Sequence, residues 1–122
     1  MKFAKYVFYA AGIYGLIALV PQYFLEEKTG RDFPPAITHP EYYYGFIGVA
    51  LAWQIAFLII GNSPSRFRPL MIPAMLEKFS FVVAVYALYA FGRVNTMMVG
   101  AASIDLILGI LFVAAFLKTA KE

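Results

Sequence analysis

Long apolar runs separated by short polar stretches form the main pattern of this chain. Four runs of about 18 to 23 residues match the roughly 20 residues that a helix needs to cross a hydrocarbon core of about 30 Å. They predict helices over residues 4–25, 41–60, 69–91 and 95–117. The runs are continuous, whereas the strands of an outer-membrane barrel alternate apolar and polar residues. We therefore expect an all-α, antiparallel four-helix transmembrane bundle, formed by residues 1–122 as a single domain.

The polar segments between these runs carry turn and capping signals. Residues 26–40 form the only sizeable polar loop, in which the Pro34-Pro35 pair disfavours helix. Thr38, followed three residues later by Glu41, fits a capping box at the start of the second helix. Asn95 fits an N-cap of the fourth helix.

The distribution of lysine and arginine predicts the orientation in the membrane, because cytoplasmic loops carry an excess of both. One end of the bundle holds Lys2, Lys5, Arg66, Arg68, Lys118 and Lys121. The other end holds fewer basic residues, and they are diluted by acids within and beside residues 26–40. Both termini are therefore expected in the cytoplasm, with residues 26–40 outside. The first run also fits a signal peptide, but Glu26-Glu27 follows it and no small-residue cleavage site does, so we expect an uncleaved helix.

The composition agrees with a membrane protein and argues against several other classes. Hydrophobic residues make up 62% of the chain and charged residues only 14%, far from the usual soluble composition. The net charge of +3 comes from basic residues that stand singly at the ends of the runs, so we expect no nucleic-acid partner. Without cysteine there is no thiolate nucleophile, and His39, the only histidine, has no evident co-ligand. We expect no metal and no cofactor, and the lack of a catalytic motif favours a non-enzymatic protein.

Polar and ionisable side chains inside the runs are the candidates for function. A rise of 1.5 Å per residue places one or more from each helix in a single band on the cytoplasmic side of the midplane. A charge near the centre of a membrane helix costs roughly 2.5–3.5 kcal/mol on insertion scales, so such residues mark functional sites. The candidate ligand-lining residues are Glu77, Asp105, Gln54, Tyr14 and Trp53.

Helical spacing predicts which way the two acids face. Asp105 shares a face with Ala101 and Gly109, and Glu77 shares one with Ala74. Small residues allow membrane helices to approach closely, so both acids are expected to face the interior of the bundle.

Three basic residues are expected at the lipid head groups. Lys78 shares a face with Met71 and Val82, which predicts the lipid side, and its long stem would let the ammonium group reach the head groups. Arg66 and Arg68 are expected to contact anionic head groups at the cytoplasmic surface.

Three segments carry a resemblance to known proteins: HPEYYYGFIGVALAWQIAFLIIG, RFRPLMIPAMLEKFSF and SIDLILGILFVAAFLKT. Over most of residues 39–118 they resemble a group of uncharacterised small four-helix inner-membrane proteins of bacteria. In size and architecture only, the chain is similar to DoxX-like proteins. The resemblance implies a bacterial cytoplasmic (inner) membrane, crossed several times, and it brings no established active site.

Three hypotheses for function follow. In the first, the interior of the bundle binds an apolar ligand such as a quinone or a lipid-like molecule. In the second, the protein is an accessory subunit of a larger membrane complex, and the buried polar residues hydrogen-bond across helices to specify packing. In the third, it is a small proton-linked transporter that acts as a homo-oligomer. Membrane lipid is the expected partner in all three.

Overall fold

The computed structural model describes residues 2–119, and within that range it is helical without any strand. Helix α1, Lys2–Leu19, continues as a 3-10 turn, η1, Val20–Phe24. A short helix, α2, Glu26–Asp32, precedes α3, Pro40–Asn62. The 3-10 turn η2, Arg68–Leu70, leads into α4, Met71–Ala90, and α5 spans Thr96–Lys118. The prediction of an all-α protein is confirmed.

Four segments are long and apolar enough to cross a membrane: Lys2–Phe24, Pro40–Asn62, Arg68–Ala90 and Thr96–Lys118. Each has 23 residues, which at 1.5 Å per residue exceeds a hydrocarbon core of about 30 Å. Large apolar side chains cover the outside of these helices, among them Ile17, Val83 and Ile107. Such a surface suits lipid and would be unusual in water. The fold indicates a multi-pass membrane protein, while its orientation and its bacterial membrane stay predictions.

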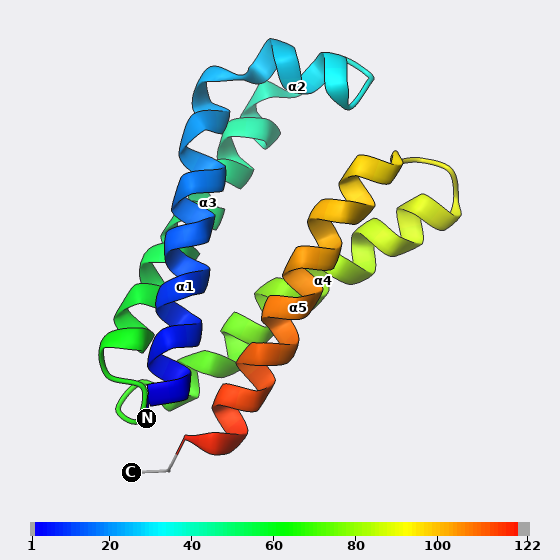
Figure 1. Ribbon diagram of the computed structural model, residues 1–122. Coiled ribbons are helices and arrows are strands. Elements are labelled where there is room, and N and C mark those ends of the chain that lie inside the picture. Colours follow the sequence, from blue (N-terminus) through cyan, green and yellow to red (C-terminus); the bar gives the residue numbers. More distant parts are fainter. Residues whose placement is uncertain (1, 120–122) are drawn as a thin grey trace.

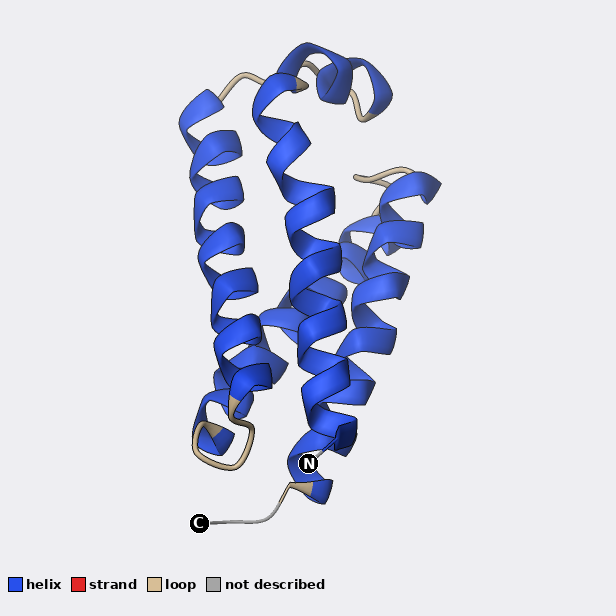
Figure 2. Ribbon diagram, turned by 60° about the vertical axis from the view of Figure 1, so that its left-hand side comes forward, coloured by secondary structure: helices blue, strands red, loops and turns tan. Residues whose placement is uncertain are grey.

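The four long helices are arranged as two antiparallel pairs, α1 with α3 and α4 with α5 (Figure 1). Contacts between α1 and α5 join the two pairs, whereas α3 and α4 touch only sparsely. The pairs lie close together at the end that holds both termini and separate toward the end that holds α2 (Figures 1 and 2). The bundle is therefore closed at one end and open at the other.

An aromatic core closes the terminal end. The rings of Phe8 and Phe112 stack with centroids 4.2 Å apart, and Phe57 meets Phe112 edge-on at 5.0 Å. All three side chains are fully buried and come from three different helices. Such aromatic pairs add roughly 0.5–1.5 kcal/mol each beyond the burial of their area. This core joins α1, α3 and α5 near the termini and leaves the opposite half of the bundle less filled.

Glycine brings α1 and α3 together. A methyl group added at Gly12 would lie 2.7 Å from the side chain of Leu58 and 2.9 Å from the carbonyl oxygen of Gln54. One added at Gly15 would lie 1.8 Å from the Gln54 amide oxygen. Both distances are too short for a real side chain. At Gly12 the neighbours include the backbone of α3, so the close approach of this pair depends on that glycine, whereas Gly15 makes room for the side chain of Gln54.

Several expectations about helix ends are corrected. Residues 26–40 were expected to be a loop, but they contain α2. The predicted capping box is wrong: α3 begins at Pro40, directly after His39, and no side chain caps its first turn. The Glu41 carboxylate, which a capping box would direct to the backbone at the start of the helix, instead has its Oε2 atom 3.4 Å from Nδ1 of His39. The predicted N-cap of α5 is confirmed, since Asn95 accepts a hydrogen bond of 3.1 Å from the backbone N–H of Met98.

Candidate functional site

A cleft of about 900 Å³ lies between the two helix pairs. Its walls come from α1, α3, α4 and α5, and its far end is lined by residues of α2 and the loop that follows. The lining is mostly apolar, with a small number of polar side chains. Small-molecule sites typically have volumes of about 300–1,000 Å³ and this same composition.

A buried ion cluster stands on the α4 and α5 walls of the cleft. The Lys78 ammonium nitrogen lies 3.2 Å from Asp105 Oδ1 and 3.7 Å from Glu77 Oε1. It also lies 5.3 Å from the centroid of the Phe57 ring, close enough for a cation–π contact with α3. Lys78 is only 3% exposed, so its charge is compensated inside the protein and not at the membrane surface.

The prediction that Lys78 faces lipid head groups is therefore wrong. The buried face of α4 consists of Met71, Ala74, Lys78, Val82 and Val85, spaced three and four residues apart. Two of these residues, Met71 and Val82, were expected on the lipid side. The physical reason for the error lies in α5, where Asp105 supplies a counter-ion.

Gly109 of α5 makes room for this arrangement. A methyl group added at Gly109 would lie 3.3 Å from Lys78 Cβ and 3.0 Å from the ring of Phe79. The small residue predicted to bring α5 close to its neighbour thus packs directly against the base of the lysine side chain. Close packing of α4 on α5 buries the stem of Lys78 and directs its ammonium group to Asp105.

The two acids lie at the edge of the cleft and keep a limited exposure. The Asp105 side chain is 19% exposed and accepts the hydrogen bond of Lys78. The Glu77 side chain is 21% exposed, and its Oε1 is buried with no hydrogen-bond partner among residues 2–119. Glu77 is therefore the less satisfied of the two carboxylates.

Gln54 forms part of the opposite wall, on α3. It is 2% exposed, and its amide nitrogen donates a 2.8 Å hydrogen bond to the carbonyl of Ala50. Its amide oxygen, Oε1, is buried and has no hydrogen-bond donor in the described part of the chain. The oxygen lies against Gly15 of α1, where only the lack of a side chain leaves space for it.

Tyr14 and Trp53 complete the set of candidates expected from the sequence. Tyr14 is 40% exposed and lines the cleft from α1. Trp53 lines it from α3, and its ring lies 6.3 Å from that of Phe57 at the edge of the aromatic core. All five candidate residues thus border a single cleft, while their role in binding a ligand stays a prediction.

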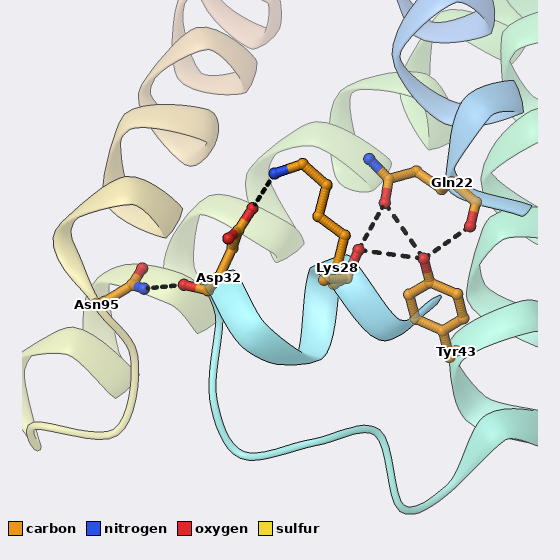
Figure 3. A network of polar contacts seen from close by, with 6 residues as sticks. Gln22, Lys28, Asp32, Tyr43 and Asn95 are labelled. Carbon is orange, nitrogen blue, oxygen red and sulfur yellow. Dashed lines mark hydrogen bonds and ion pairs between the residues drawn. The ribbon is translucent and has the colours of Figure 1, made fainter. Parts of the chain in front are cut away.

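A polar network that was not expected from the sequence holds α2 across the open end (Figure 3). Tyr43 of α3 donates a 2.7 Å hydrogen bond to the carbonyl of Gln22 and lies 3.3 Å from the hydroxyl of Thr29 in α2. At the other end of α2, the side chain of Asn95 donates a 3.1 Å hydrogen bond to the carbonyl of Asp32. Helix α2 therefore connects the two helix pairs where they are furthest apart. No local sequence pattern signals these contacts, because they join segments up to 63 residues apart.

Arg66 and Arg68 lie in the connection between α3 and α4, at the end of the bundle that holds the termini. The Arg68 Nε donates a 3.0 Å hydrogen bond to the carbonyl of Phe116, and its guanidinium lies 3.7 Å from the Phe116 ring. Arg66 is exposed and lies 5.3 Å from the ring of Phe67. Contact of both arginines with head groups stays a prediction. Lys121, which was counted for the orientation, lies outside the described residues.

Among residues 2–119, no group of three or more histidine, cysteine, aspartate or glutamate side chains could hold a metal ion. His39 is exposed beside Glu41 at the start of α3.

Comparisons with protein-family models, with curated proteins and with solved structures gave no match to this chain. The resemblance to small bacterial inner-membrane proteins accordingly stays a prediction.

Proposed function

We propose that this protein binds a lipid-like molecule in the cleft between its two helix pairs. The apolar body of the ligand would lie along the mostly apolar walls, and its polar group would reach the cluster of Glu77, Lys78 and Asp105. The observation that supports this function best is the presence of a buried ion cluster on the wall of an apolar cleft of about 900 Å³.

Two features of the cleft support binding over packing alone. If the polar residues served only to fix helix packing, they would be expected to be satisfied by one another, as buried polar groups generally are. The amide oxygen of Gln54 and one carboxylate oxygen of Glu77 have no hydrogen-bond donor in the described part of the chain. The cleft also separates α3 from α4, so its volume is not consumed by helix contacts.

The accessory-subunit and transporter hypotheses have no comparable observation in their favour. The exposed apolar side chains that a partner helix would cover are equally suited to lipid. The accessory-subunit hypothesis is retained as one outcome of the experiment that tests ligand binding.

The test is purification in a mild detergent from the native membrane, followed by mass spectrometry of the molecules that co-purify. Two exposed alanines on opposite walls of the cleft, Ala18 and Ala101, allow it to be filled without changing any charge. We expect a lipid-like molecule to co-purify with the wild-type protein and to be lost from the Ala18→Phe/Ala101→Phe variant. The matched control is Ala10→Phe/Ala84→Phe, at two exposed alanines that do not line the cleft, and it should keep the ligand.

Two outcomes would contradict the proposal. Equal amounts of bound lipid in both double variants would show that lipid is held on the outer surface. Other membrane polypeptides in fixed stoichiometry, without a bound amphiphile, would favour an accessory subunit.

A further inference from the structure

The charges along the cleft do not balance. Among the described residues that line it, Glu77 and Asp105 are the acids and Lys78 is the only basic residue. Two carboxylates thus share one ammonium group, and the closer partner is Asp105, at 3.2 Å against 3.7 Å for Glu77. With both acids ionised, one negative charge lacks a counter-charge in a site that is partly shielded from water. Uncompensated charge is strongly disfavoured in such surroundings, so either a proton on Glu77 or a cationic group of the ligand has to balance it.

Two oxygen atoms of the cleft residues also lack a hydrogen-bond donor within residues 2–119. Gln54 Oε1 and Glu77 Oε1 are both buried acceptors without a donor in the described part of the chain, and they belong to helices on opposite sides of the cleft. The Gln54 amide nitrogen donates to the carbonyl of Ala50, and the Ser80 hydroxyl donates to the carbonyl of Glu77. Lys78 lies 3.7 Å from Glu77 Oε1, which is beyond hydrogen-bonding distance. Among the described residues, Glu77 therefore lacks both a hydrogen-bond donor to this oxygen and a full counter-charge.

We propose that the ligand of this cleft is an amphiphile whose polar group is a protonated amine, bound beside Glu77. This inference rests on the proposed function and specifies the chemical class of its ligand. A primary ammonium group supplies one positive charge and three hydrogen-bond donors, which are the two properties that Glu77 lacks. The cluster then contains two carboxylates and two ammonium groups.

Other polar groups fit this site less well. A carboxylate or a phosphate would add negative charge beside Glu77 and would compete with Asp105 for Lys78. A quinone offers carbonyl acceptors alone, so Glu77 would remain without a donor. An alcohol supplies a donor and leaves the charge uncompensated. The expected order of affinity is amine, then alcohol, then carboxylate.

The experiment compares three ligands with the same chain: dodecylamine, dodecanol and dodecanoate, each brominated on the chain. Trp53 is the only tryptophan and lines the cleft, so quenching of its fluorescence by bromine reports occupancy directly. The protein is placed in nanodiscs of zwitterionic lipid, which prevents the amine from concentrating on an anionic surface. The Ala18→Phe/Ala101→Phe variant keeps Trp53 as the single tryptophan, and it measures the quenching that comes from the surrounding lipid.

We expect dodecylamine to bind about tenfold more tightly than dodecanol, as one charge-assisted hydrogen bond would give. Glu77→Gln keeps the shape of the side chain and removes its charge. It should weaken dodecylamine about tenfold and leave dodecanol within about twofold. Glu41→Gln, at an exposed acid near the start of α3, is the matched control and should change neither.

The possible results separate the two proposals. Dodecanol or dodecanoate binding as tightly as dodecylamine would overturn the amine inference and leave the proposed function standing. Quenching by all three ligands that is no stronger than in the Ala18→Phe/Ala101→Phe variant would overturn the proposed function itself. The comparison of ligands on the wild-type protein needs no variant, so it decides the inference even if Glu77→Gln does not fold.

Discussion

Lys78 of α4 and Asp105 of α5 form an ion pair of 3.2 Å across the helix interface, beside a cleft that runs between the two halves of the bundle. The lysine is buried, and a second acid, Glu77, precedes it in the chain at 3.7 Å. The three charges differ in how many partners they have. Lys78 is the counter-ion of both acids, so the three residues should differ in how much their loss lowers the free energy of unfolding.

Replacing Lys78 by methionine should be the most damaging change in the cluster. Lys78→Met leaves both carboxylates without a counter-ion in a largely buried site, and we expect it to lower the free energy of unfolding by about 3 kcal/mol. Asp105→Asn should cost less, because Lys78 keeps Glu77 as a partner, and Glu77→Gln least, because the shorter pair remains intact. Unfolding in mixed micelles with increasing dodecyl sulfate measures the three variants. Equal losses of stability in the three variants would show that Lys78 is not the shared counter-ion of both acids.

The contact between Gly15 and Gln54 predicts a second effect on stability. Gly15→Ala would place a methyl group 1.8 Å from the present position of the Gln54 amide oxygen, so that side chain must move. We expect a loss of about 1–3 kcal/mol, as for other overpacked sites. Adding Gln54→Ala should restore much of the loss, because it removes the obstructing group. Gly45→Ala is the control, since no atom lies within 4 Å of its added methyl group, and it should not destabilise the protein.

The hydrogen bond from Asn95 to α2 can be removed without losing the N-cap of α5. Asn95→Ser keeps an oxygen that can accept from the Met98 N–H, and serine is among the preferred N-caps. It removes the amide group that donates to the Asp32 carbonyl. Hydrogen exchange of the α2 amides should become faster, while the first turn of α5 keeps its protection. Unchanged exchange in α2 would show that the contacts of Gln22, Thr29 and Tyr43 hold this helix by themselves.

The orientation can be tested because the chain has no native cysteine. Ser65→Cys lies in the connection between α3 and α4, and Glu27→Cys lies in α2 at the opposite end of the bundle. An impermeant maleimide should label Glu27→Cys in intact bacterial spheroplasts and should label Ser65→Cys only after the membrane is opened. The reverse pattern would place both termini outside and would contradict the prediction from the basic residues.

The sequence by itself determined the four membrane-spanning helices. Length and apolar composition are properties of each segment alone, so the runs around residues 41–60 and 95–117 predict α3 and α5 within a few residues. The Asn95 cap was predictable for the same reason, because its hydrogen bond closes within three residues. These features need no knowledge of neighbouring helices.

Only the tertiary structure decided which way Lys78 faces, that α2 crosses the open end, and that the two helix pairs separate into a cleft. Adjacent residues of a helix lie about 100° apart, since a turn has 3.6 residues, so both Glu77 and Lys78 can border one site. The ion pair of Lys78 depends on Asp105, which lies 27 residues away. The space for Gln54 likewise depends on a glycine in another helix. Each of these features is a relationship between helices, and hydrophobic patterning within a single helix carries no information about its neighbour.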